Sequence, residues 1–223
     1  VCGSNDVNVQ VAVNAINEAL LSGGATIDWS VTDQSKKGVD ADFAQLVDAM
    51  NAGSVGALIV YGANPVYSWF DADKVKNGLK KVGVTVSLNP RLDETTILCK
   101  YVVPDHHYLE SWGDAEPKSG YISLMQPTIH PLFKTRQWQD SLLKWSGAAT
   151  DYLSLVKTTW VARLGSTTAW DMALQSGVIN PAESVASGAA FNSAAVAGAV
   201  AALSAAKKVS GIELVLYEKV SIG

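Results

Sequence analysis

The spacing of apolar residues near the start of the chain predicts an amphipathic helix. After "GSND" the apolar positions recur every three or four residues, at Val9, Val13, Ile16 and Leu20. This repeat is typical of one helix face that packs against other elements. Asn5 or Asp6 stands where an N-cap residue accepts free backbone N–H groups. We therefore expect a helix that begins here and buries one face.

A second helix and a buried strand are predicted next. A polar connector with glycines (residues 23–40) leads to "ADFAQLVDAMNAG", whose Asn51 and Gly53 suit a left-handed helix end. The following "VGALIVYGANP" has a continuous apolar centre of strand length between glycines. Such a run is typical of a parallel strand, so we expect Leu58, Ile59 and Val60 to be covered on both faces.

The next segments complete a βαβ unit. In "DADKVKNGLKKVG" the acidic residues come first and the lysines last, which favours a helix, and "VTVSLN" is a short strand rich in β-branched residues. "YVVP" is a third strand. The expected fold class is α/β, a parallel doubly wound sheet flanked by helices. Ligands of such sheets lie beyond the carboxyl ends of the strands, here at "YGANP" and "LNPRLDE".

Beyond Asp105 the pattern weakens and predicts a long loop. It is followed by helices around "QWQDSLLKWSG", "TDYLSLVKTTWVARL" and "TAWDMALQSG", an alanine-rich helix over residues 194–206 and a last strand, "IELVLYEKV". We divide the chain into a dinucleotide-binding-like α/β core, residues 1–147, and a helical extension with a closing strand of the same domain, residues 148–223.

Composition changes this picture little. The 223 residues, 48% hydrophobic and 17% charged, suffice for a sizeable core. A net charge of −4 without basic runs excludes nucleic acid as an expected partner. The alanine-rich tract is too short and too weakly apolar to span a membrane. The start "VCGSNDVNVQ" has neither Met nor a targeting segment, so we expect an internal part of a longer polypeptide.

The two cysteines, Cys2 and Cys99, are too few for an iron–sulfur cluster and do not form a Cys-x-x-Cys zinc pattern. A disulfide between them and two free thiols both remain open. The seven tryptophans can form a partner-binding face, but their helical spacing favours core packing.

His106, His107 and Glu110 are the candidate metal ligands, because imidazole and carboxylate groups within four residues suit zinc. Adjacent histidines on an extended backbone point to opposite faces, however, and no second group of His or Cys completes the ligand set. We favour a loop at a strand end in which Glu110 caps or pairs.

The loop from Tyr61 to Pro65 has two interpretations. Gly-x-Asn-Pro after a parallel strand suits a phosphate or guanosine contact. The alternative is a structural turn in which Gly62 permits an unusual backbone angle, Asn64 bonds its own backbone and Pro65 ends the strand. The second interpretation is favoured.

Taken in order, these residues resemble the molybdopterin oxidoreductases, the superfamily of dimethyl sulfoxide reductase and the periplasmic nitrate reductases. The matching positions are Gly62, Asn64, Pro65, Glu94, Thr95, Pro104, Glu110 and Gly113. Their common order is more specific than any single motif. The resemblance implies a frame that, in the superfamily, holds the guanosine end of the molybdenum cofactor.

The departures from the superfamily pattern concern that cofactor. Asn89 stands where the superfamily has an aspartate that meets guanine, and Cys99 and Lys100 replace its Ala-Asp pair. Around Gly120, three residues replace the Asn, Glu and Arg of another element: Pro117, Ser119 and Tyr121. An amide cannot accept the two N–H bonds of guanine with charge assistance. We therefore expect no cofactor-binding residue, only a vestigial pocket of Gly62, Asn64, Asn89, Glu94, Thr95, Glu110 and Gly113.

The whole chain is similar to one branch of the superfamily, the iron–sulfur subunit of bacterial alternative complex III. The resemblance is carried by "MNAGSVGALIVYGANPVYSW", "PDHHYLESWGDAEPKSG" and "SLMQPTIHPLF", among other segments. It implies 4Fe-4S and 3Fe-4S clusters elsewhere in the subunit, no molybdenum cofactor, and a place on the periplasmic side of the inner membrane. The implied partners are haem c and quinol-oxidising integral membrane subunits and a terminal oxidase.

The resulting hypothesis is a structural segment, without catalytic residues or metal ligands, of a quinol:cytochrome c oxidoreductase. One alternative is a fragment of a true molybdenum enzyme that binds the guanosine end of the cofactor. Another is an independent α/β domain that binds a small ligand.

Overall fold

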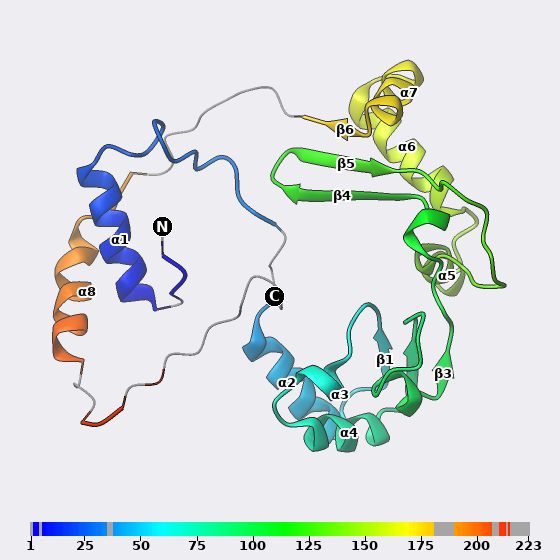
Figure 1. Ribbon diagram of the computed structural model, residues 1–223, viewed down its shortest axis with the longest axis horizontal. Coiled ribbons are helices and arrows are strands. Elements are labelled where there is room, and N and C mark those ends of the chain that lie inside the picture. Colours follow the sequence, from blue (N-terminus) through cyan, green and yellow to red (C-terminus); the bar gives the residue numbers. More distant parts are fainter. Residues whose placement is uncertain are drawn as a thin grey trace. The chain divides into compact units, whose positions relative to one another are not determined.

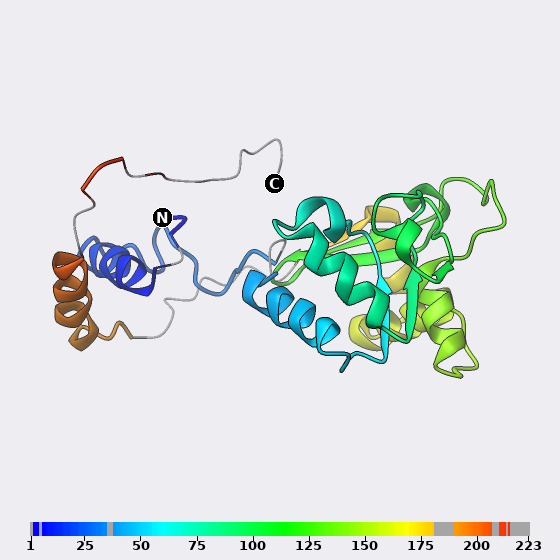
Figure 2. The same cartoon turned by 90° about the horizontal axis from the view of Figure 1, so that it is seen from below.

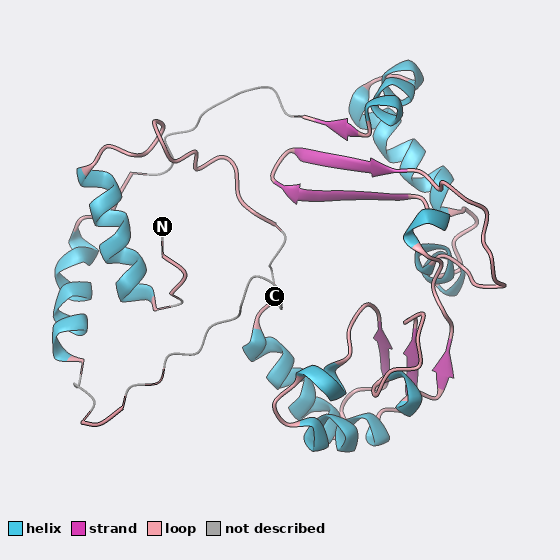
Figure 3. Cartoon of the chain, in the orientation of Figure 1, coloured by secondary structure: helices cyan, strands magenta, loops and turns pink. Residues whose placement is uncertain are grey.

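The computed structural model describes residues 2–4, 6–34, 38–180, 190–206, 210–212 and 214. The chain divides into two compact units, Thr32–Ala182 and a smaller one that joins Val1–Val31 to Glu183–Gly223. Figures 1 and 2 show their elements from perpendicular directions, and Figure 3 distinguishes helices from strands. The boundary predicted between residues 147 and 148 falls inside the larger unit and stays a prediction.

The first half of the larger unit contains a three-stranded parallel sheet, in the order β1-β2-β3, and the helices that connect its strands. Its elements are α2 (Asp40–Asn51), β1 (Ala57–Val60), α3 (Pro65–Ser68), α4 (Ala72–Lys81), β2 (Val84–Ser87), the 3₁₀ helix η1 (Thr96–Leu98) and β3 (Tyr101–Val102). The predicted α/β class, a parallel sheet flanked by helices, is confirmed. So are all three predicted strands and both predicted helices.

Local signals explain where these helices begin and end. Asp71 caps α4 by accepting the Lys74 N–H at 3.0 Å, and two lysines occupy the last turn of the helix. After α2, Gly53 takes a left-handed φ of +74°, as the sequence predicts. Such caps satisfy backbone groups that the helix itself leaves unpaired.

The core of this half lies between one face of the sheet and α2, α3 and α4. Leu58 of β1 packs against its buried side chains, which are Val47, Met50, Val66, Val75, Leu79 and Val82. The helices α2 and α4 pack closely where residue 78 is glycine, because a Cβ there would lie 2.9 Å from the Met50 Cβ. Burial of these aliphatic side chains stabilises the fold.

The expectation that Leu58, Ile59 and Val60 are all covered is wrong for Ile59. Val60 is 7% exposed, but Ile59 is 46% exposed. The side chains of a strand alternate between faces, so Ile59 points away from the face that carries Leu58. Because β1 is an edge strand and its helices cover the Leu58 face, Ile59 stays half open.

The second half of the larger unit contains an antiparallel sheet that the sequence analysis missed. Its strands pair in the order β4-β5-β6. The elements are η2 (Tyr108–Glu110), β4 (Gly113–Lys118), β5 (Tyr121–Met125), α5 (Trp138–Trp145), α6 (Tyr152–Leu164), α7 (Thr167–Ser176) and β6 (Val178–Ile179). The predicted long loop after Asp105 is therefore wrong over β4 and β5, whereas the three predicted helices are confirmed.

Tryptophans hold this second half together. Trp160 and Trp170 are 5% and 3% exposed and form a core with Val156. The indole N–H of Trp160 donates to Asp114 Oδ2 at 2.9 Å, and the Tyr152 hydroxyl donates to Asp114 Oδ1 at 2.7 Å. Core packing, the favoured interpretation of the tryptophans, is confirmed for Trp160 and Trp170.

The smaller unit pairs α1 (Val7–Ala19) with the alanine-rich α8 (Ala194–Ala205). Asp6 caps α1 through the N–H groups of residues 8 and 9. The expectation that α1 buries one face is wrong, because the helix has no buried residue and Ile16 is 59% exposed. The helix α8 is composed mostly of alanine, whose small side chains bury little apolar area.

Two other expectations concern the last predicted strand and membrane-spanning helices. Of the strand predicted over residues 212–220, only residues 212 and 214 are described, and the rest lies outside the described residues. Among the residues that are described, no helix has the length and apolar character needed to cross a membrane.

Candidate functional site

The loop after β1 turns at Gly62, which adopts a left-handed φ of +62° that suits glycine. Its N–H donates to Asn89 Oδ1 at 2.8 Å. Pro65 follows as the first residue of α3, a position where the missing N–H costs nothing. The structural-turn interpretation is confirmed for Gly62. For Asn64 it is wrong, because the side chain bonds a different loop instead of its own backbone.

Asn89 joins the carboxyl ends of β1 and β2 with every polar atom of its side chain. Its Nδ2 group donates to the Ala63 carbonyl at 2.8 Å, to Asp93 Oδ2 at 2.9 Å and to Thr96 Oγ1 at 3.3 Å. The residue is 4% exposed. Both amide hydrogens of this buried carboxamide are used within the chain, and its oxygen already accepts one bond, so the side chain has no free donor for a ligand.

Asn64, Glu94 and Thr95 form the adjoining part of this network. Asn64 Nδ2 donates to Glu94 Oε2 at 2.6 Å, and the Thr95 hydroxyl donates to Asn64 Oδ1 at 2.7 Å. The Thr95 hydroxyl also accepts the Val66 N–H at 3.0 Å, and Thr95 is fully buried. The bond from Asn64 lowers the pKa of Glu94. We call Gly62, Asn64, Asn89, Glu94 and Thr95 the β1–β2 network.

Glu110 and Gly113 lie outside this network. Glu110 accepts the His107 N–H at 2.9 Å and the Leu132 N–H at 2.9 Å, and it completes a capping box on η2. The expectation that Glu110 caps is confirmed. Gly113 begins β4, where a Cβ would lie 2.7 Å from Met125 Cε. Both residues have structural partners within the chain.

The residues that replace the superfamily's Asn, Glu and Arg lie on the β4–β5 hairpin. Ser119 and Gly120 form its turn, where Gly120 has a φ of +79°. The Ser119 hydroxyl shares a hydrogen bond of 2.6 Å with the Thr32 hydroxyl. Lys118 lies over the Tyr121 ring, 4.6 Å from its centre. None of these contacts reaches the β1–β2 network.

The two adjacent histidines bind different partners. His106 Nδ1 lies 2.6 Å from Thr135 Oγ1 and 4.0 Å from Glu110 Oε2. His107 Nδ1 accepts the Leu109 N–H at 3.3 Å. In the part of the chain that the structure describes, no three His, Cys, Asp or Glu residues form a metal-binding group.

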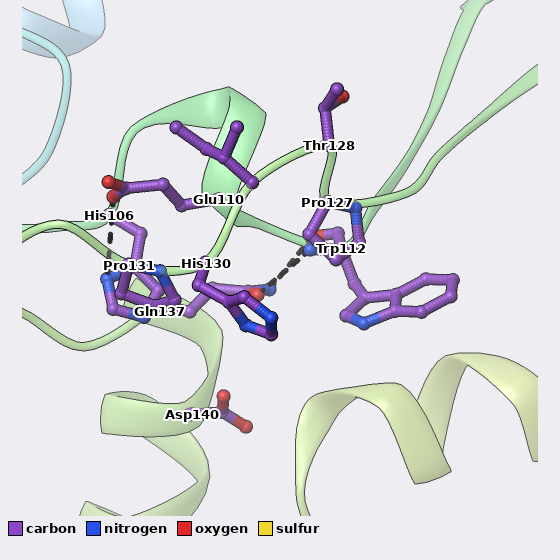
Figure 4. Close-up of a pocket in the computed structure, with 10 residues that line it drawn as sticks. His106, Glu110, Trp112, Pro127, Thr128, His130, Pro131, Gln137 and Asp140 are labelled. Atoms are coloured by element: carbon purple, nitrogen blue, oxygen red, sulfur yellow. Dashed lines mark hydrogen bonds and ion pairs between the residues drawn. The ribbon is translucent and has the colours of Figure 1, made fainter.

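A cavity of about 710 Å³ lies at the carboxyl ends of the parallel strands, where ligands of such sheets bind. Tyr61, Gly62, Pro90 and Pro104 line it from the strand ends, and residues 105–110 and 129–135 complete it. A neighbouring cavity of about 350 Å³ shares His106 and Glu110 and extends to Trp112 and Asp140 (Figure 4). There Gln137 bonds both the N–H and the carbonyl of Trp112.

Sequence reasoning missed the polar cluster that closes the larger cavity. Asp105 accepts the N–H groups of His106 and Trp138, both at 2.8 Å. Burial raises the pKa of Asp105. Burial and the neighbouring Asp105 raise the pKa of Tyr61, whose ring lies 4.9 Å from that of Trp138. The one signal in the sequence is the position of Asp105, directly after the third strand.

Neither cysteine lines either cavity. Cys2 is exposed, Cys99 is partly buried, and both are free. Burial raises the pKa of the Cys99 thiol, which makes it less reactive than an ordinary thiol.

Replacing Glu110 by glutamine is expected to make the stability less sensitive to acid. The backbone N–H groups of Leu132 and His107 hold the pKa of Glu110 below its ordinary value of 4.5. A carboxyl with a lowered folded pKa stabilises the fold above its unfolded pKa and loses this effect as the pH falls through the folded pKa. Urea denaturation should therefore show a wild-type advantage at pH 7 that shrinks below pH 4.5.

The matched control is Glu18→Gln, which removes an exposed carboxylate from the smaller unit. The pH dependence of its difference from wild type is the baseline against which the Glu110→Gln difference is compared. A Glu110→Gln difference that stays constant as the pH falls to 3 would contradict the assignment of Glu110 as a charged cap.

Comparison with known proteins relates the chain to a molybdopterin-binding-like protein. No protein-family model matches it. Over 109 residues it is 33% identical to the molybdopterin-binding-like subunit of menaquinone reductase from Nitratidesulfovibrio vulgaris. The match covers 47% of this chain and 16% of that subunit. A molybdopterin-oxidoreductase-like relationship is therefore supported, and the narrower resemblance to alternative complex III stays a prediction.

Among solved structures, acetylene hydratase from Pelobacter acetylenicus is similar. The alignment covers 57% of this chain and 16% of the acetylene hydratase chain. The identity is 18% and the TM-score 0.35. A likeness of this size adds nothing to the fold assignment, which stands on the sheet itself.

Proposed function

We propose that this chain is a structural, non-catalytic segment of the molybdopterin-oxidoreductase-like subunit of a respiratory quinol:acceptor oxidoreductase. The observation that carries the proposal is the β1–β2 network. Asn89, which stands where the resemblance implies a guanine-contacting acid, and Thr95 of the same vestigial pocket are 4% and 0% exposed and bonded within the chain. The network holds the strand ends together in the place of a ligand.

The residues present do not fit the guanosine end of a molybdenum cofactor. Guanine offers two N–H donors on one edge, which a carboxylate accepts well. Asn89 instead presents one oxygen, already bonded to the Gly62 N–H, and an amino group that donates to Ala63 and Asp93. Opening this site would break these hydrogen bonds, each of which contributes about 0.5–1.5 kcal/mol to stability. No chemical step is assigned to this segment.

The similarity to a subunit named for menaquinone reductase supports the wider part of the proposal. In the complex that we propose, iron–sulfur clusters elsewhere in the subunit carry electrons from quinol to an acceptor such as cytochrome c. The partners we propose are haem c and integral membrane subunits and a terminal oxidase, on the periplasmic side of the bacterial inner membrane. Alternative complex III is the narrower form of this proposal.

The double variant His106→Ala with His107→Ala tests whether the strand-end cavity takes part in the chemistry. Both imidazoles have partners within the chain, so we expect iron content and quinol oxidation per assembled complex to stay near wild type. The matched control is Thr135→Val, which removes the partner of His106 and leaves both imidazoles in place. Loss of turnover in complexes that assemble with normal iron, specific to the histidine variant, would reinstate proton transfer or metal binding at this cavity.

A further inference from the structure

The smaller unit contains a cavity of its own, with a volume of about 490 Å³. Helix α1, the connector that follows it and the residues around the start of α8 line this cavity. Its volume lies in the range of cavities that hold small organic molecules. It is separate from the β1–β2 network, all of whose residues belong to the larger unit.

Helix α1 turns a polar side towards this cavity. Val11, Asn14 and Glu18 line it and are three and four residues apart, so they share one side of the helix. The apolar repeat that includes Val9 and Val13 lies on the opposite side. The side of α1 at the cavity therefore offers hydrogen-bonding groups in place of core contacts.

The polar side chains at this cavity are not engaged by the protein. Asn14 and Asn17 are half-buried and Glu18 is exposed. Among the described residues, no hydrogen bond or ion pair engages any of these three side chains. Polar side chains with restricted access to water normally have partners, so two amides and a carboxylate at one cavity are well placed to bind a ligand.

Two aromatic rings line the same cavity. Trp29 is 46% exposed and Phe191 is half-buried. In the described part of the chain, neither ring contacts another aromatic ring or a cation. The face of such a ring carries partial negative charge and attracts cations.

The charge of the smaller unit has a single sign among its described residues. Asp6, Glu18 and Asp28 are its charged side chains there, and these residues include no Lys, Arg or His. The resulting field attracts cations and repels anions such as phosphate. The carboxylate, the ring faces and the amide oxygens at the cavity all favour positive charge.

We propose that this cavity binds an organic cation, a primary ammonium or guanidinium group carried on a short aliphatic body. The Glu18 carboxylate offsets the charge, and the amide oxygens of Asn14 and Asn17 accept N–H groups of the cation. The rings of Trp29 and Phe191 pack against the cation and its aliphatic body. Such a group occurs on free amines and on Lys or Arg side chains of a partner, and the experiment distinguishes these sources.

NMR of the tryptophan indole N–H groups in the 223-residue chain tests this inference. The chain has seven tryptophans, and the signal of Trp29 is the one that disappears in the Trp29→Phe variant. The first probe is butylguanidinium, and its control is butylurea, which has the same shape without the charge. The second probe is acetyl-Gly-Arg-Gly-amide, which carries the same cation on a peptide.

We expect butylguanidinium to shift the Trp29 signal saturably and to leave the other indole signals in place. Butylurea should bind at least about fivefold more weakly, as expected for the loss of the cation–ring attraction. Tighter binding of the peptide than of butylguanidinium supports a partner's side chain as the source, and weaker binding supports a free amine. No saturable shift up to about 10 mM butylguanidinium, or equal binding of butylurea, would overturn the inference.

Two variants with matched controls locate the site. Glu18→Gln and Phe191→Leu should each weaken the binding of butylguanidinium about threefold or more. The controls Asp73→Asn and Phe70→Leu make the same changes at exposed positions of the larger unit and should leave the affinity unchanged. Equal effects of variants and controls would contradict the assignment to this cavity. These readouts do not depend on cofactor content or turnover, so they are independent of the proposed function.

Discussion

Replacing Leu79 by alanine is expected to lower the free energy of unfolding by about 2–5 kcal/mol, a large part of the stability of an ordinary domain. Leu79 of α4 is 3% exposed and packs against α2 and the covered face of the sheet. The loss combines removed apolar burial with the cavity that the shorter side chain leaves. Urea denaturation of the 223-residue chain measures it.

The matched control is Ile59→Ala on the opposite face of the sheet. Ile59 is 46% exposed, so the same measurement should give a loss of about 1 kcal/mol from the smaller buried area. Equal losses for Leu79 and Ile59 in the 223-residue chain would contradict the one-sided core.

Replacing Asn89 by alanine is expected to destabilise the larger unit by about 1–3 kcal/mol, because its buried side chain makes several hydrogen bonds that each contribute about 0.5–1.5 kcal/mol. The Gly62 N–H and the Ala63 carbonyl both lose their bonds to the Asn89 side chain. The control is Asn192→Ala, which removes an exposed asparagine that bonds the Ala194 N–H. A loss at Asn89 no larger than at Asn192 would contradict the structural role of the β1–β2 network.

The variant Asn89→Asp restores the acid of the superfamily pattern, and we expect it to bind no pterin. A carboxylate oxygen in place of Nδ2 would face the Ala63 carbonyl and the Asp93 carboxylate, which now accept from Asn89 at 2.8 and 2.9 Å. Repulsion would raise the pKa of the introduced carboxyl, so the destabilisation should be larger at pH 7 than at pH 4. Detectable pterin in the purified variant would show that the vestigial pocket is less altered than proposed.

The helices and parallel strands could be predicted because their signals are local. Asp6 and Asp71 mark helix starts, Gly53 marks a helix end, and apolar runs between glycines mark β1 and β2. The β4–β5 hairpin gave no such signal. Its strand "GDAEPK" is mostly exposed and carries charges and a proline, so neither alternation nor β-branched residues reveal it.

Whether a given face of a helix or strand is buried could not be predicted from the same patterns. The apolar spacing in α1 and in β1 shows which side chains share a face but not whether anything packs on it. Ile16 and Ile59 fit their patterns and yet are 59% and 46% exposed. Burial depends on partners distant in the sequence, which periodicity does not identify.

The membership of the candidate site was predicted in part, because Glu110 and Gly113 lie outside the β1–β2 network, and its bonding was missed. Gly62, Asn64, Asn89 and Thr95 do meet at the carboxyl ends of β1 and β2. Their bonding to one another, together with Asp93, follows from loop conformations that single residues do not specify. Tyr61 and Asp105 were missed because their contact depends on the fold.

The central claim is that the β1–β2 network occupies the place of a cofactor. The most direct test is the molybdenum and pterin content of the complete wild-type protein, purified in its native complex. It is measured by elemental analysis and by the fluorescence of oxidised pterin, with iron as the internal reference. The account predicts iron without molybdenum or pterin. One molybdenum and a stoichiometric amount of guanosine-bearing pterin per polypeptide would contradict it.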